Sequence, residues 1–138
     1  MKFPISAAQT TSGIYVFARV LDKIRLHAAG ELPSVYHLGV VPGNRTFDDR
    51  VCKFLSIDFE AVRARTLQGG TDEEIIEWCF RNGTRPDAEQ IEIWNGFMSK
   101  RGWRDNSGFD KDKADAGFAD RPEIQTYFEL FDAEEGRL

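Results

Sequence analysis

Four charged side chains recur within one short segment of the chain, A-R-V-L-D-K-I-R at residues 18–25. When successive residues are placed about 100° apart, they fall on one side of a helix: Arg19, Asp22, Lys23 and Arg25. Guanidinium groups bind carboxylates and phosphates through paired hydrogen bonds. The segment therefore predicts a site for a small anionic ligand, in which Asp22 orients an arginine. The alternative is an ion-pair ladder on the surface, which would contribute little to stability.

A second candidate for chemistry is the dipeptide Tyr36-His37, which lies in a segment bounded by Pro and Gly. Loops often carry catalytic groups, and a tyrosine and a histidine can transfer protons. Because adjacent residues of an extended segment point to opposite faces, the two need not share a site. Asn95 follows Trp94 on a helix that looks buried, so it could line a pocket or cap a neighbouring helix.

The sequence predicts no metal site and no cofactor. A metal site needs three or four convergent ligands, and the chain has two histidines without an H-E-x-x-H pattern. Gly69-Gly70 lacks the lysine and the preceding strand of a phosphate-binding loop. Cys52 and Cys79 lie far apart among apolar neighbours, which favours two buried thiols over a disulfide or a zinc knuckle.

Helices are expected to position these residues. Apolar residues recur at helical spacing over 14–29, and T-D-E-E at 71–74 is a capping box that opens a helix. The segment 34–43 is predicted to be irregular or extended because it is short and bounded by Pro and Gly. The fold class expected is all-α, a compact bundle of about five to six short helices, at residues 14–29, 47–55, 59–67, 72–81, 86–100 and 122–133.

The predicted domain organisation is a single domain over residues 1–138. Its helical core spans 1–104. A linker or surface loop follows at 105–121, where Gly, Asp and Lys alternate without helical period. The remainder, 122–138, is expected to be an acidic C-terminal helix docked on the core.

Charge is unevenly distributed along the chain. The net charge is −5, with +1 in residues 1–104 and −6 in residues 105–138. This asymmetry predicts that a carboxylate near the end of the chain pairs with the basic face of the first helix, closing its site or replacing its ligand. The candidate carboxylates are Asp132, Glu134 and Glu135.

Composition also argues against some classes of partner. The acidic last quarter would repel phosphate backbones, so nucleic acid is not expected as a partner. The longest apolar run, residues 14–18, is far shorter than the roughly 20 residues of a membrane-spanning helix. Residues 1–6 do not have the pattern of a signal peptide. A cytoplasmic location without membrane contact is therefore expected, with the protein partner left open.

Several motifs together resemble a bacterial family known as a domain of unknown function. The most specific is A-R-x-x-D-K-x-R at 18–25, supported by shorter elements: Y-H at 36–37, F-L-x-I-D at 54–58, T-D-E-E-I-I-E-W at 71–78, I-x-x-W-N at 91–95, W-R-D at 103–105 and D-x-E-E-G-R at 132–137. The resemblance implies one intact domain in a bacterial cytoplasm. It makes the charged residues of 18–25 signature positions and transfers no catalytic residue.

Three functions remain open at this point. The first is a binding or regulatory module for a small anionic ligand, centred on Arg19, Lys23 and Arg25. The second is a protein-interaction or structural domain whose acidic tail docks on its own basic helix or reaches a partner. The third is an enzyme that uses Tyr36 and His37 beside the charged face, in a pocket joining the first helix to the 34–43 loop.

Overall fold

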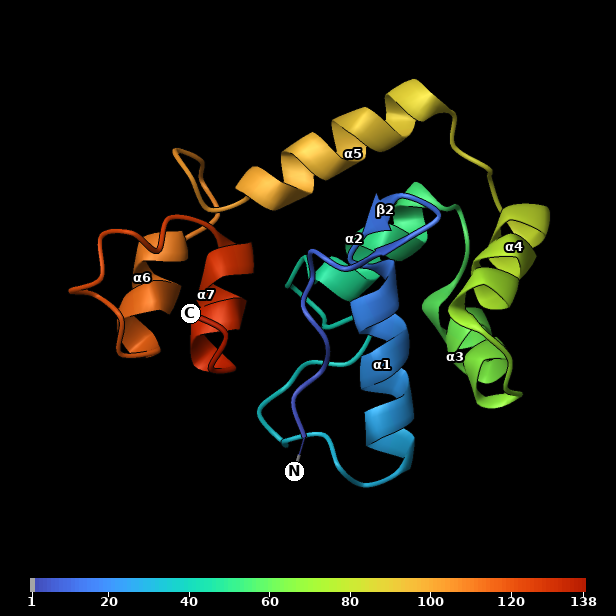
Figure 1. The fold of residues 1–138 in the computed structure, drawn as a ribbon, viewed down its shortest axis with the longest axis horizontal. Helices are drawn as coiled ribbons and strands as arrows, with labels where there is room; N and C mark the ends of the chain where they lie inside the picture. The colour runs from blue at the N-terminus through green and yellow to red at the C-terminus, as the bar shows by residue number, and fades with distance from the viewer. Residues whose placement is uncertain (1) are drawn as a thin grey trace.

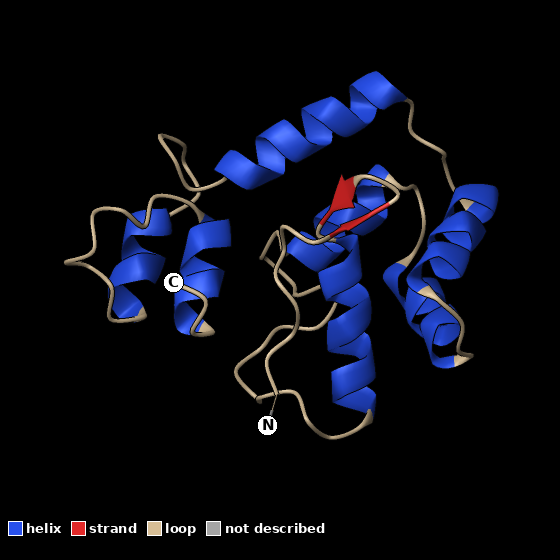
Figure 2. Cartoon of the chain, in the orientation of Figure 1, coloured by secondary structure: helices blue, strands red, loops and turns tan. Residues whose placement is uncertain are grey.

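The computed structural model describes residues 2–138, and helices dominate it (Figures 1 and 2). Within these residues the mostly α architecture is confirmed, but there are seven helices rather than five to six, together with one small hairpin. The elements in chain order are β1 (Thr10–Thr11), β2 (Ile14–Tyr15), α1 (Phe17–Ala28), α2 (Phe47–Phe54), α3 (Phe59–Leu67), α4 (Asp72–Asn82), α5 (Ala88–Lys100), α6 (Phe109–Asp115) and α7 (Tyr127–Glu134).

The first helix begins later than its apolar pattern predicted. Ser12 and Gly13 both have positive φ, 50° and 78°, and form the two-residue turn of an antiparallel hairpin. This turn pairs β1 with β2, so the apolar Ile14–Tyr15 belongs to a strand. Helix α1 therefore starts at Phe17.

Side-chain caps fix the starts of the next three helices where the sequence placed them. Thr46 accepts a hydrogen bond from the backbone of Asp49 at the start of α2, and Asp58 does the same for α3. The capping box before α4 is present, with Thr71 and Glu74 exchanging side-chain to backbone hydrogen bonds. Each cap satisfies backbone N–H groups that the helix itself leaves without a partner.

The last quarter of the chain differs most from expectation. The predicted linker or loop at 105–121 contains α6, a two-turn helix that buries only Phe109 and so shows no apolar period. The last helix begins at Tyr127 rather than at 122, because Thr126 accepts a hydrogen bond from the backbone of Glu129 and caps it there.

Helix α1 lies at the centre of the molecule, and α5 runs across one end from α4 to the pair α6 and α7 (Figure 1). The main core surrounds α1, and a second cluster joins α6 to α7. Phe47 and Phe131 pack against both clusters. The 34–43 segment is irregular, as predicted, apart from an isolated bridge between Val41 and Asn44. None of the helices in residues 2–138 is long and apolar enough to cross a membrane.

Candidate functional site

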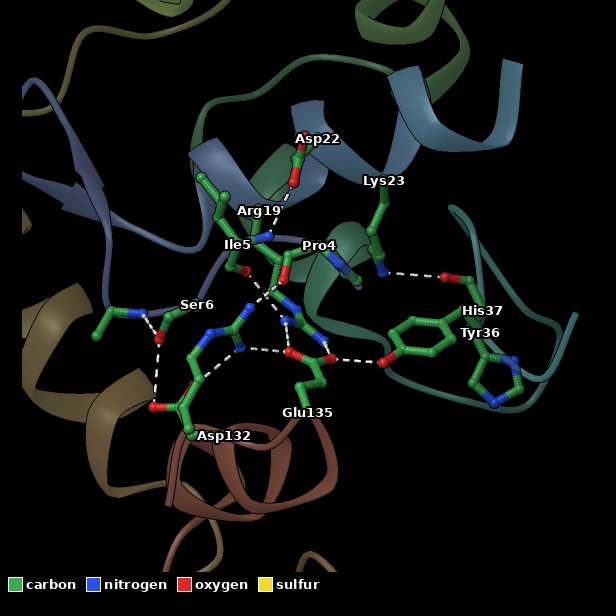
Figure 3. Close-up of polar contacts among 12 residues, drawn as sticks. Pro4, Ile5, Ser6, Arg19, Asp22, Lys23, Tyr36, His37, Asp132 and Glu135 are labelled. Carbon is green, nitrogen blue, oxygen red and sulfur yellow. Dashed lines mark hydrogen bonds and ion pairs between the residues drawn. The ribbon is translucent and has the colours of Figure 1, made fainter. Parts of the chain in front are cut away.

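Arg19 is paired with a carboxylate from the end of the chain. It donates hydrogen bonds to both carboxylate oxygens of Glu135, at 2.8 and 2.7 Å (Figure 3). Only 7% of the Arg19 side chain and 1% of the Glu135 side chain are exposed. Arg19 also donates to the carbonyl of Ile5 at 3.0 Å and lies 4.8 Å from the ring centre of Phe131. The predicted pairing of a terminal carboxylate with the first helix is confirmed for Glu135.

Two further donors complete the surroundings of Glu135. The hydroxyl of Tyr36 donates to Oε2 at 2.6 Å, and the guanidinium of Arg137 donates to Oε1. Burial by itself would raise the pKa of Glu135, but the hydrogen bonds from Arg19 and Tyr36 and the charge of Arg19 bring it below the ordinary glutamate value. Burial and the neighbouring Glu135 carboxylate raise the pKa of Tyr36. Glu135 is therefore ionised and Tyr36 neutral at pH 7.

A second buried ion pair lies one helical turn further along α1. The ammonium of Lys23 is 2.7 Å from a carboxylate oxygen of Asp48 and donates to the carbonyl of His37 at 2.9 Å. Asp48, of which 1% is exposed, also accepts a hydrogen bond from the backbone of Gly39 at 2.8 Å. Burial lowers the pKa of Lys23, and its partner Asp48 opposes that shift. These contacts fasten the 34–43 segment to α1 and α2.

The side chains of Tyr36 and His37 diverge. The phenol of Tyr36 points to Glu135, whereas the imidazole of His37 points away from that cluster (Figure 3). His37 is exposed, and its contact with Lys23 is made by its backbone carbonyl. An acid–base pair formed by these two neighbours has no support in this geometry.

The four charged residues of α1 do not act as one group. Arg19 and Lys23 face the Tyr36 segment, but Asp22 accepts a hydrogen bond from the backbone of Ile5 at 2.8 Å. Arg25 pairs with Asp72, at the start of α4, at 2.7 Å. Asp22 and Arg25 therefore tie α1 to its neighbours.

Asn95 holds the hairpin against α5. Its side chain accepts a hydrogen bond from the backbone of Tyr15 at 3.0 Å and donates to the carbonyl of Gly13 at 2.8 Å. Trp94 adds a hydrogen bond from its indole N–H to the carbonyl of Tyr15 at 3.1 Å. Asn95 therefore bonds to a neighbouring hairpin and does not line the pocket described next.

A pocket of about 530 Å³ lies beside the two buried ion pairs. Helices α1, α6 and α7, the segments 35–37 and 43–48, and the loop after α5 contribute to its walls. It joins the first helix to the 34–43 loop, as the enzyme alternative required. Of the seven predicted site residues, four line it: Arg19, Lys23, Tyr36 and His37. Its apolar wall includes Val16, Val20, Phe47, Tyr127, Leu130 and Phe131.

Most charged groups of the pocket are already satisfied by the protein. Besides the two buried ion pairs, Arg101 is 3.2 Å from Asp105, and Asp112 accepts a hydrogen bond from the hydroxyl of Tyr127. Two groups differ. Over residues 2–138, neither Arg45 nor Glu134 has an ion-pair or side-chain hydrogen-bond partner, and both are exposed.

The surroundings of Glu134 also shift its pKa. Desolvation and the adjacent Glu135 carboxylate raise its pKa above the ordinary glutamate value. The neighbouring carboxylates of Glu134 and Glu135 thus have pKa values shifted in opposite directions. One is buried and fully bonded, and the other faces the pocket without a partner.

A match to a known protein family extends over nearly the whole chain. The family model described as a domain of unknown function (DUF5069) matches residues 1–137. The chain belongs to this family. A comparison with curated proteins gave no significant match. The match to the DUF5069 family includes Arg19 at one end and Glu135 at the other, so both members of the buried pair lie within the family domain.

Asp48, Arg45 and Tyr127 are among the pocket residues of this DUF5069 member that the sequence did not single out. Asp48 lies in the first turn of α2, where a carboxylate is favourable for the helix by itself, but Asp49 donates the capping bond and the Asp48 side chain turns inward. Arg45 stands in an irregular turn and has no pattern around it. Tyr127 is a largely apolar residue of α7, and its hydroxyl bonds to α6, a helix the sequence did not reveal. The charge asymmetry was the one signal that led to Glu135.

Proposed function

We propose that this protein is a binding module for a small molecule carrying an anionic group, and that the pocket beside α1 is the binding site. The observation that carries the proposal is a pocket of about 530 Å³ with two buried ion pairs in its walls. That volume lies within the roughly 300–1,000 Å³ typical of small-molecule sites. An apolar wall with a few fixed polar groups is also typical of such sites.

The buried ion pairs support a binding role because folding alone does not require them. Removing two charges from water costs about as much as their attraction returns, so apolar residues of similar volume serve stability equally well. Placing Arg19 with Glu135 and Lys23 with Asp48 beside a pocket gives it rigid polar walls instead. Val16 adds local strain at the same wall, since this β-branched residue has a φ of 81°.

Arg45 is the group that we assign to the ligand's anion. Arg19 and Lys23 are neutralised by buried carboxylates, so they shape the wall and do not offer a free charge. Arg45 lines the pocket and keeps its hydrogen-bond donors free of any partner within residues 2–138. A guanidinium binds a carboxylate or phosphate through two parallel hydrogen bonds.

Thermal-shift measurements with an anion panel test this proposal. The panel contains inorganic phosphate, phosphorylated sugars, nucleotides and small carboxylates. A compound that binds the native state raises the melting temperature by mass action. We expect at least one such compound, with a shift that is lost in Arg45→Gln and kept in Arg81→Gln, a change of an exposed arginine on α4 far from the pocket. No shift from any anion would contradict the proposal.

A protein-interaction domain is the second candidate, favoured by an exposed apolar pair on α5. Ile93 and Phe97 are one helical turn apart and 65% and 47% exposed, and Trp103 is 46% exposed beyond the helix end. Isolated apolar residues on a surface are common, but neighbouring ones mark interaction sites. Sedimentation of the wild type and of Ile93→Ser/Phe97→Ser would show whether this face mediates self-association.

We propose a bacterial, cytoplasmic setting for this binding function. The resemblance of the 18–25 motif to a bacterial family supports the first part. Two free cysteines, both buried, support the second, because a reducing compartment keeps thiols in that form. Immunodetection in fractions of the source cell would test the location.

A further inference from the structure

The two unpartnered charges of the pocket have opposite signs. Arg45 comes from the turn before α2, and Glu134 comes from the last residue of α7. A ligand that is only an anion would satisfy Arg45 and leave Glu134 facing a site of negative charge, which is unfavourable. A ligand that carries both an ammonium and a carboxylate would satisfy both groups.

A second cavity adjoins the first and shares one wall with it. It has a volume of about 330 Å³, and Val35, Tyr36 and Glu134 line both cavities. The remaining residues of its lining are apolar: Phe3, Pro33, Ala116 and Phe118. Glu134 therefore stands where the larger cavity, which contains the charged groups, meets a smaller apolar one.

From this arrangement we propose that the ligand is a free α-amino acid with an apolar side chain. Its carboxylate binds Arg45, its ammonium binds Glu134, and its side chain enters the second cavity. The α-carbon of an amino acid carries all three groups, and the protein offers one counterpart for each: Arg45 in the larger cavity, Glu134 where the two cavities meet, and the apolar lining of the smaller cavity. This inference rests on the proposed function and names the class of ligand for the same pocket.

A ligand ammonium would oppose the two effects that raise the pKa of Glu134. Partial desolvation by the pocket walls and the adjacent Glu135 charge raise its pKa, and an ammonium close to it would stabilise the ionised form. The other carboxylates facing this part of the pocket are already engaged, Glu135 with Arg19 and Asp112 with Tyr127. Glu134 is thus the acceptor left for a ligand donor.

Calorimetric titration with three compounds of one scaffold tests the inference. L-phenylalanine carries both charges, 3-phenylpropanoate lacks the ammonium, and 2-phenylethylamine lacks the carboxylate. L-leucine and L-methionine serve as further amino-acid probes. We expect an amino acid to bind about tenfold more tightly than either single-charge analogue, since each lost charge-assisted hydrogen bond corresponds to roughly that factor.

Substitutions at Glu134 and Arg45 test the ammonium contact and the carboxylate contact separately. Glu134→Gln should remove the preference for L-phenylalanine over 3-phenylpropanoate, and Arg45→Gln should remove its preference over 2-phenylethylamine. Glu92→Gln, an exposed change on α5, should alter neither. If 3-phenylpropanoate binds as tightly as L-phenylalanine, or if no amino acid binds while a compound of the anion panel does, this inference is wrong and the proposed function stands. If neither set of compounds binds, both are wrong.

Discussion

Arg19 and Glu135 are joined by two buried hydrogen bonds although they lie 116 positions apart in the sequence. Arg19 also binds the carbonyl of Ile5, and Arg137 binds that of Pro4. The pair therefore fastens the end of the chain and the N-terminal segment to the central helix. The pocket depends on this closure, because α7 supplies one of its walls.

Neutralising Glu135 should destabilise the fold. In Glu135→Gln, the Arg19 guanidinium stays buried without a counter-charge, which costs about 3 kcal/mol or more. The matched control is Glu134→Gln, an exposed neighbour without a partner in residues 2–138, for which a change within about 0.5 kcal/mol is expected. Urea denaturation of both variants measures the difference. Equal stability of the two variants would contradict a structural role for the pair.

The same carboxylate should make stability depend on pH. The pKa of Glu135 in the folded chain is lower than its ordinary value of 4.5. Its contribution is therefore fully present above the unfolded value and is lost as the pH falls through the folded one. We expect the unfolding free energy of the wild type to fall more steeply below pH 4.5 than that of Glu135→Gln. Parallel pH profiles of the two proteins would count against this coupling.

Most helices that were predicted correctly from the sequence have local signals at their starts. The Thr71 capping box and the Thr46 and Asp58 caps are interactions between near neighbours, so the residues involved can be read directly. The hairpin of β1 and β2 was not predicted because β2 belongs to an apolar run with helical spacing. Helix α6 was not predicted because it is too short and too polar to show a periodic pattern.

The site was harder to predict because its contacts are distant in sequence. Net charge revealed that some terminal carboxylate should meet α1, but only the packing of α7 selects Glu135 over Glu134. Sequence spacing placed Asp22 and Arg25 beside Arg19. The fold separates them because Ile5 and Asp72 bind them from different sides.

Two glycines should respond in opposite ways to alanine. A Cβ at Gly83 would collide with the carbonyl oxygen of Leu55, which the backbone of Thr84 holds by a hydrogen bond at 2.8 Å. Gly83→Ala should therefore destabilise the protein by about 1–3 kcal/mol. Gly96 lies inside α5 with nothing within 4 Å of an added Cβ, so Gly96→Ala should stabilise it by about 0.5–1 kcal/mol. Thermal unfolding of both variants checks the signs.

The two cysteines should be unreactive in the native protein. Burial raises the pKa of Cys52 to about 12 and that of Cys79 to about 11, so little thiolate is present at neutral pH. We expect a thiol-specific reagent such as Ellman's reagent to react with both cysteines only at the rate of unfolding. Rapid labelling without added denaturant would show that the core opens more readily than its packing indicates.

The most direct test of the account is titration of the wild type and Arg45→Gln with the compound that shifts the melting temperature most. Chemical-shift perturbation in nuclear magnetic resonance spectra reports both affinity and position. We expect saturable binding, with the shifted resonances around Arg45, Tyr36 and Glu134, and about tenfold weaker binding by Arg45→Gln. Perturbations confined to Ile93 and Phe97 on α5, or equal affinity in the two proteins, would contradict this expectation.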